Sequence, residues 1–81
     1  MKARVYVSLK TTVLDPQGKA VCAALAGLGH AAIADVRQGK FFDITISDEI
    51  SREEAQKGVE TIAHEVLANP VIEEYRVELL G

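Results

Sequence analysis

The sequence contains few side chains that could act as nucleophiles, metal ligands or general acids and bases. There is one cysteine, Cys22, and there are two histidines, His30 and His64, scattered along the chain. A metal site needs several such ligands at suitable spacings, and a nucleophilic thiol needs a base beside it. Neither pattern is present. We therefore predict no catalytic residue, no metal ligand and no cofactor-binding residue in this chain.

Acidic residues gather at one place, around the start of a predicted helix. Ser51 and Glu54 match a capping box, and Asp48, Glu49 and Glu53 lie close to them in sequence. Carboxylates near a helix N-terminus are stabilised by the helix dipole. A carboxylate pair for acid–base catalysis would also need a cleft, which nothing in the sequence predicts. Phosphate-loop, dinucleotide-binding and catalytic-triad motifs are absent.

Length and composition predict one small domain, residues 1–81. With 48% hydrophobic residues and few aromatics, its core must consist of Val, Ile, Leu and Ala. A chain of this size buries only about 60% of its unfolded surface, so oligomerisation is a common source of added stability. The net charge of −3 argues against nucleic acid as a partner. A single cysteine and the lack of a long apolar run predict a cytoplasmic protein without a membrane span.

Hydrophobic periodicity predicts an α+β domain of the ferredoxin-like order β-α-β-β-α-β. Strands are predicted at Lys2–Lys10, Ala32–Arg37, Phe41–Ser47 and Val71–Leu80. Helices are predicted from Pro16 to about Leu28 and from the Ser51 cap to Asn69-Pro70. The triplet Gln38-Gly39-Lys40 is predicted to turn the two middle strands into a hairpin. This order predicts a four-stranded antiparallel sheet with both helices on one face.

Each predicted helix has an apolar stripe that should pack on the sheet. The stripes are Val21, Ala24, Leu25 and Leu28 in the first helix, and Ala55, Val59, Ile62, Ala63, Val66 and Leu67 in the second. Gly29 is a natural C-terminal stop for the first helix, and Asn69-Pro70 ends the second.

The sheet face opposite the helices is predicted to be polar but partly aromatic. It carries Arg4, Tyr6, Ser8, Phe41, Asp43, Thr45, Arg76 and Glu78. Tyr6, Phe41 and Arg76 are our candidates for contact with another subunit. RNA-recognition domains place aromatics on the same two strands, but Asp43 would repel phosphate. The alternative prediction is a small ligand- or RNA-binding module of the same topology.

The stretch VLDPQG precedes the first predicted helix and contains more than a helix start requires. Asp15 can accept hydrogen bonds from the first turn, and Pro16 fits the first helical position. Gln17 and Gly18 are not needed for that role, and Gly18 weakens a first turn by roughly 1 kcal/mol relative to alanine.

The chain resembles the PurS family, the small subunits of bacterial and archaeal phosphoribosylformylglycinamidine (FGAM) synthase. The resemblance rests on VYVSLK, VLDPQG, DVRQGK and LANPVIEEYRVEL, spread over the whole chain in the family's order. It implies a non-catalytic assembly subunit in the fourth step of de novo purine biosynthesis. Such a subunit bridges a glutaminase, which releases ammonia, and a large ATP-dependent synthetase, and helps ammonia pass between them.

The resemblance also implies partners and contact sites. ATP and Mg²⁺ are expected on the large subunit. This chain is expected to self-associate as a homodimer or a dimer of dimers. The stretch Asp15, Pro16, Gln17 and Gly18 is one candidate partner contact, with simple helix initiation as the alternative. Arg37, Gly39 and Lys40 form a second candidate, in which the cations would pair with acidic residues of a partner; the alternative is a solvated hairpin tip.

Overall fold

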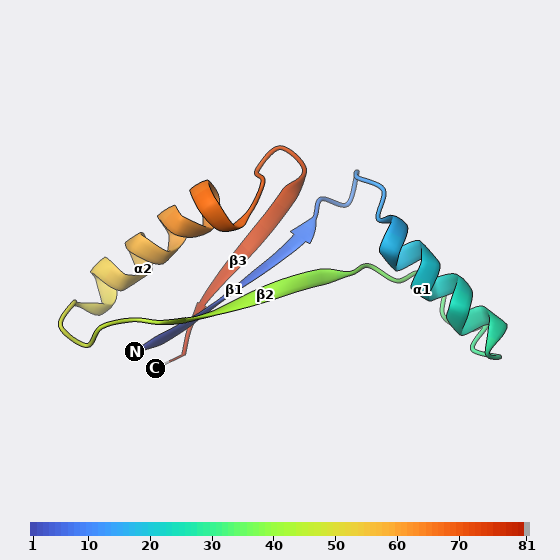
Figure 1. The fold of residues 1–81 in the computed structure, drawn as a ribbon, viewed down its shortest axis with the longest axis horizontal. Helices are drawn as coiled ribbons and strands as arrows, with labels where there is room; N and C mark the ends of the chain where they lie inside the picture. The colour runs from blue at the N-terminus through green and yellow to red at the C-terminus, as the bar shows by residue number, and fades with distance from the viewer. Residues whose placement is uncertain (81) are drawn as a thin grey trace.

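The computed structural model describes residues 1–80 and contains three strands and three helical segments (Figure 1). In chain order they are β1 (Lys2–Leu9), α1 (Pro16–Gly27), β2 (Gly39–Thr45), α2 (Arg52–Ile62), the π-helical turn η1 (Ala63–Leu67) and β3 (Glu73–Leu79). The strands form one sheet in the order β2-β1-β3, and both pairings are antiparallel. Sheet, α2 and η1 together are called the body below.

The core lies between the central strand and α2. The alternating residues Ala3, Val5 and Val7 are almost completely buried. Val59 of α2 and Ala63 of η1 belong to the same buried cluster, and Ala55 of α2 is buried as well. Small side chains on both sides allow the helix to lie close to the sheet, and Phe42, Ile44, Val77 and Leu79 pack around the edge of this core.

The second helix begins and ends as the sequence predicts. The Ser51 hydroxyl accepts a hydrogen bond from the Glu54 backbone N–H at 3.2 Å. At the other end the backbone widens into η1, where the Ala68 N–H donates to the Ala63 carbonyl, and helical structure stops at Leu67. The predicted stripe is too wide, because Ile62 and Val66 are 42% and 73% exposed.

The prediction of a four-stranded sheet is wrong, because the sheet has three strands and the predicted second strand is missing. Residues 32–37 form no strand, and Gln38-Gly39-Lys40 is not a turn; β2 begins at Gly39, so there is no hairpin. The cause is local. The Gln38 N–H donates to the Asp15 carboxylate, and Arg37 donates to carbonyls that follow β1. These bonds hold the segment beside the start of α1 instead of allowing it to fold back along β2.

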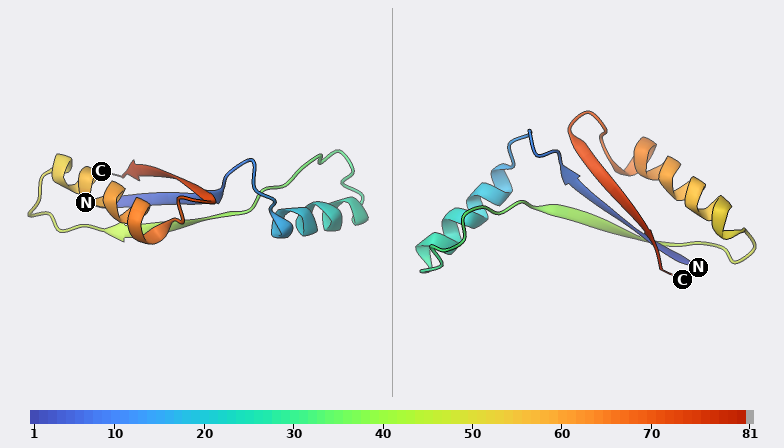
Figure 2. Two further views of the ribbon diagram at one scale, coloured as in Figure 1. Left: turned by 90° about the horizontal axis from the view of Figure 1, so that it is seen from above. Right: turned by 180° about the vertical axis from the view of Figure 1, so that it is seen from behind.

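The predicted placement of both helices on one sheet face is also wrong. Only α2 lies over the sheet, whereas α1 projects beyond the end of β1 and β2 (Figures 1 and 2). Its predicted inward residues Val21 and Leu28 are 41% and 76% exposed. Gly29 does adopt the positive φ, 94°, expected of a helix stop. We call residues 14–38, which contain α1 and the segment returning from it, the arm.

The arm makes the chain unusually long for its mass. The principal extents are 51 × 26 × 14 Å and the radius of gyration is 16.3 Å. A compact domain of this length would have a radius of gyration of roughly 12 Å. The isolated chain is therefore not a closed ferredoxin-like unit.

Candidate interaction surfaces

The predicted contact residues of the open sheet face form one cross-strand row. In the strand register Tyr6 lies opposite Phe41 on one side and opposite Arg76 on the other. The Tyr6 and Phe41 ring centroids are 6.3 Å apart, and the Arg76 guanidinium lies 4.2 Å from the Tyr6 centroid. The three residues proposed from the sequence are therefore neighbours, and together they form a flat cation–aromatic surface.

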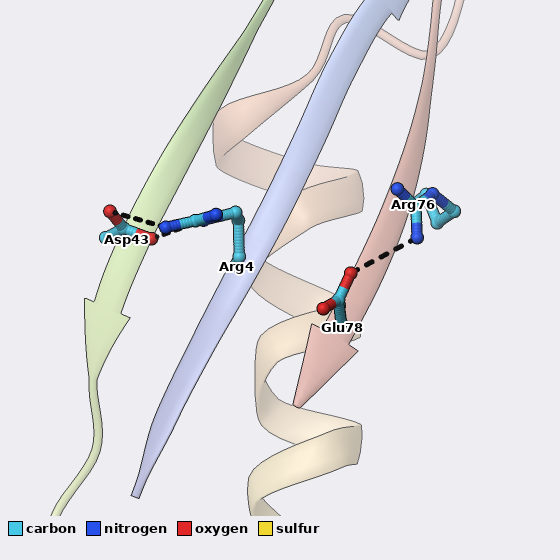
Figure 3. Close-up of polar contacts among 4 residues, drawn as sticks. All are labelled: Arg4, Asp43, Arg76 and Glu78. Carbon is cyan, nitrogen blue, oxygen red and sulfur yellow. Dashed lines mark hydrogen bonds and ion pairs between the residues drawn. The ribbon is translucent and has the colours of Figure 1, made fainter. Parts of the chain in front are cut away.

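A second row of the same face consists of charged residues (Figure 3). Arg4 lies between Asp43 and Glu78 in the register and donates to Asp43 at 2.7 Å. Arg76 contacts Glu78 at 3.3 Å along β3. The Arg4 hydrogen bond lowers the pKa of Asp43 and raises that of Arg4. Cations and carboxylates thus neutralise each other locally, and the face presents no uncompensated basic strip.

The two partner-contact candidates lie together at the base of the arm. Asp15 is 4% exposed, and its carboxylate accepts hydrogen bonds from the backbone N–H groups of Gly18 at 2.9 Å and Gln38 at 2.6 Å. The bond from Gly18, followed by that from Gln38, lowers the pKa of Asp15. Asp15 therefore caps α1, as predicted, and also ties the far end of the arm to its beginning.

Gly18 is explained by the chain itself. A Cβ at this position would collide with the Val36 carbonyl oxygen and would lie 2.7 Å from Oδ2 of Asp15. The second reason for this glycine, close approach of another backbone, is thus met within the chain.

Arg37 has a role that the sequence did not reveal. Its guanidinium donates to the carbonyls of Lys10 and Val13, each at 2.9 Å. The sequence predicted a hairpin here, so Arg37 was expected at a charged tip. The pattern of residues 32–47 gave no sign that this segment would lie against the residues after β1. The bond from Gln38 to Asp15 and the bonds of Arg37 itself hold the segment there.

A shallow hollow of about 260 Å³ at the arm base joins the two predicted patches. It is lined by Val7, Ser8, Leu9, Asp15, Gln17, Gln38, Gly39, Lys40 and Glu73. A Cβ on Gly39 would lie 3.0 Å from the Val7 carbonyl, so close strand packing, and not a turn, explains this glycine. Pro16 lies outside the hollow and is exposed at the first helical position.

The reactive residue types remain dispersed in three dimensions. His64 stacks edge-on with Tyr75 at 6.0 Å, and the Cys22 thiol lies beside the Ile33 carbonyl in the arm. Within residues 1–80, no three potential His, Cys, Asp or Glu ligands are grouped to hold a metal ion. None of the helices over the same residues has the length and apolarity needed to cross a membrane.

The fold and these surfaces define a class: a small α+β chain with a polar open sheet face and a projecting arm, and without a grouped set of reactive side chains in the described residues. Comparison with known proteins narrows this class. The sequence model of the family "PurS: Phosphoribosylformylglycinamidine (FGAM) synthase" matches residues 2–81. This chain belongs to the PurS family.

Relatives match along nearly their whole length. The chain is 46% identical to the FGAM synthase subunit PurS of Bacillus subtilis, covering 96% of this chain and 90% of that protein, and 45% identical to that of Mycobacterium leprae, covering 94% and 91%. A solved B. subtilis PurS structure matches with a TM-score of 0.80 and 44% identity over 95% of this chain and 94% of that one. A chain in the structure of PurLQS from Thermotoga maritima matches with a TM-score of 0.86 and 30% identity over 98% and 95%. These matches include the arm.

Proposed function

We propose that this chain is a non-catalytic assembly subunit of FGAM synthase. In this role it bridges the glutaminase and the ATP-dependent synthetase in the fourth step of de novo purine biosynthesis and helps ammonia pass between them. The observation that carries the proposal is membership of the PurS family along almost the whole chain. Its relatives are named as subunits of this synthase, and one structural neighbour belongs to a structure described as PurLQS.

A bridging subunit needs separate surfaces for its neighbours, and this chain has them. The open sheet face presents Tyr6, Phe41 and Arg76 across the middle of the body. The arm base presents Gln17 and Lys40 around the hollow where β1 ends and β2 begins. We assign the arm base to a partner enzyme and the open face to self-association, as a homodimer or dimer of dimers.

The remaining parts of the proposal concern location and cofactors. ATP and Mg²⁺ bind to the large synthetase subunit, and this chain contributes no cofactor ligand. A cytoplasmic location follows from the pathway, and a lone, partly exposed Cys22 suits a reducing compartment.

Reconstitution tests the assembly role directly. The chain is mixed with purified glutaminase and synthetase subunits, and FGAM formation is measured with glutamine or with ammonium as nitrogen donor. We expect the chain to be inactive alone and to be required for the glutamine-dependent reaction. Equal glutamine-dependent rates with and without it would refute the proposal.

Variants can then locate the partner contact. Lys40→Glu, at the hollow, should weaken complex formation, whereas Lys57→Glu, on α2, should serve as a matched charge-reversal control. If both variants bind the partner enzymes as well as the parent chain does, the arm base is not the contact.

The alternative function is RNA or small-ligand binding by the open face. The adjacency of Tyr6 and Phe41 favours it, because bases stack on such rings. Asp43 and Glu78 on the same face oppose it, since carboxylates repel phosphates. Titration with single-stranded RNA at low salt distinguishes the two functions: tight, salt-sensitive binding that is lost in Tyr6→Ala would favour the alternative.

A further inference from the structure

One edge of the sheet carries unused backbone hydrogen-bonding groups. β3 is an outer strand in the order β2-β1-β3, so it pairs with β1 alone (Figure 3). The Leu80 N–H, just after β3, donates to the Lys2 carbonyl of β1. Because backbone groups alternate in direction along a strand, the even-numbered residues of β3 face β1. The N–H and C=O groups that point away from the sheet therefore belong to Tyr75, Val77 and Leu79.

This edge lacks several features that prevent a strand from pairing with another chain. β3 contains no proline, and all seven of its residues pair with β1 in continuous register, without a bulge. Within residues 1–80, no backbone–backbone bond outside the sheet ladder involves Tyr75, Val77 or Leu79. An exposed sheet edge of this kind can accept an added strand from a partner.

A groove runs along this edge, between β3 and α2. It has a volume of about 620 Å³, and Leu79 forms its strand side. Its helix side is formed by Arg52, Glu53, Gln56, Lys57 and Glu60. Successive side chains of an added strand would point to opposite faces of the sheet, so every second one would point to the face on which the groove lies. The groove thus offers side-chain contacts beside the free backbone groups.

The helix beside the groove is acidic. Residues 48–65 contain six carboxylates and two Lys or Arg side chains, a net charge of −4 with His neutral, whereas the whole chain has a net charge of −3. Glu53 and Glu60 line the groove, and neither is ion-paired with a cation of residues 1–80. Charge complementarity therefore favours a basic segment in the groove.

We propose that the free edge of β3 and the groove beside it bind an extended, basic segment of one partner enzyme, which adds a strand to the sheet. The inference rests on the proposed bridging role and goes beyond it. A bridge needs a separate surface for each enzyme, and the arm base supplies only one. A second copy of this chain fits this edge less well, because antiparallel pairing of two β3 edges would bring two acidic α2 helices together on one sheet face.

Hydrogen exchange tests the added strand without any substitution. The chain exchanges in D₂O alone and in complex with each purified partner enzyme, and its amides are measured by NMR after the complex is dissociated. We expect the amides of Tyr75, Val77 and Leu79 to exchange more than about 10-fold more slowly in one of the two complexes, because they then donate to the added strand. Residues 74, 76 and 78 should be protected in the free chain already, since they pair with β1.

Two results of this experiment would contradict the proposal. Unchanged exchange of the three outward amides in both complexes would show that neither enzyme pairs with β3. Protection of the same amides when the chain alone is concentrated would show that the edge binds a second copy instead.

Charge reversals test the groove. Glu60→Lys should weaken binding to that enzyme about 5- to 10-fold, because attraction for a basic segment becomes repulsion. Glu49→Lys makes the same change of charge at an exposed residue that does not line the groove, and should bind as the parent chain does. Lys57→Glu makes the groove more acidic and should bind at least as tightly as the parent chain. Equal weakening in Glu49→Lys, or weakening in Lys57→Glu, would overturn the assignment.

The assembly role and this contact can fail separately. If Glu60→Lys binds both enzymes as tightly as the parent chain does and supports the same glutamine-dependent rate, the β3 contact is wrong and the assembly role stands. If the parent chain itself is not required for the glutamine-dependent reaction, the assembly role is wrong and this contact is wrong with it.

Discussion

Replacing Gly18 by alanine gives opposite predictions from helix propensity and from this structure. In a helix, alanine is more stable than glycine by about 1 kcal/mol. At this position, however, the new Cβ meets the Val36 carbonyl and the Asp15 carboxylate, and one of the two is backbone that has little room to move. Overpacking of this kind typically costs about 1–3 kcal/mol. Less the roughly 1 kcal/mol that alanine gains in a helix, we expect a net loss of up to about 2 kcal/mol at the arm base.

The loss should be local, because α1 does not pack on the sheet. Native-state hydrogen exchange should show faster exchange at residues 19–27 in Gly18→Ala, with β1 and α2 unchanged. Gly58→Ala is the matched control: Gly58 lies inside α2, and a Cβ there meets nothing within 4 Å. That variant should gain about 0.5–1 kcal/mol of stability. At fixed protein concentration, each kcal/mol corresponds to a rise of roughly 4–8 °C in melting temperature for a domain of this size.

The direction of the change in amide exchange in α1 shows whether the Val36 carbonyl constrains Gly18. If Gly18→Ala leaves exchange in α1 unchanged or slower, the close approach of Val36 does not constrain this residue. The glycine would then need another explanation, such as close approach by a partner. If the exchange rates of α1 and α2 rise together, the arm and body unfold as one unit and the loss is not local.

Three further predictions concern the arm base and the core. Arg37→Ala should release the connection after β1 and cost on the order of 1 kcal/mol, measured as faster exchange at residues 10–14, since the bonds it removes are exposed. Hydrogen bonds lower the pKa of Asp15, so its stabilisation is fully present above the unfolded pKa of about 3.9 and is lost as pH falls through the lower folded value. The helical circular dichroism of the chain should therefore be flat from pH 8 to 5 and decline below about 4, and the acid step should be smaller in Asp15→Asn. Ala63→Leu, at a residue with no exposed surface, should destabilise the body by about 1–3 kcal/mol in urea unfolding, whereas Val66→Leu on the exposed side should change it little.

The sequence predicted the body well because its signals are local. Alternation places Ala3, Val5 and Val7 on one face of β1, and the structure buries all three. The Ser51 cap and the Asn69-Pro70 stop bound the second helix at the expected places. On the opposite face the same alternation brings Tyr6 and Phe41 into one row, although only the register shows that Arg76 completes it.

The arm could not be predicted in the same way, because its conformation depends on contacts between residues distant in sequence. The alternation of residues 32–37 is compatible with a strand, but a strand also needs a neighbour. In the structure the segment has none, and the Gln38 N–H donates to the Asp15 carboxylate instead. The sequence shows that the Asp15 carboxylate can cap a helix. It gives no sign that the same carboxylate will also accept a hydrogen bond from a residue 23 positions away. The helix boundaries were therefore predictable, and the direction of the helix was not.

The same distinction explains why an apolar stripe did not reveal its partner. Periodicity shows that Val21 and Leu28 share one side of α1, and burial of that side would stabilise the helix. It does not specify whether the covering sheet belongs to the same chain. In the structure these residues stay exposed, because hydrogen bonds from Arg37 and Gln38 hold the arm outward from the sheet. The ferredoxin-like pattern in the sequence thus predicted the helices and three of the strands, but not that only α2 would lie over the sheet.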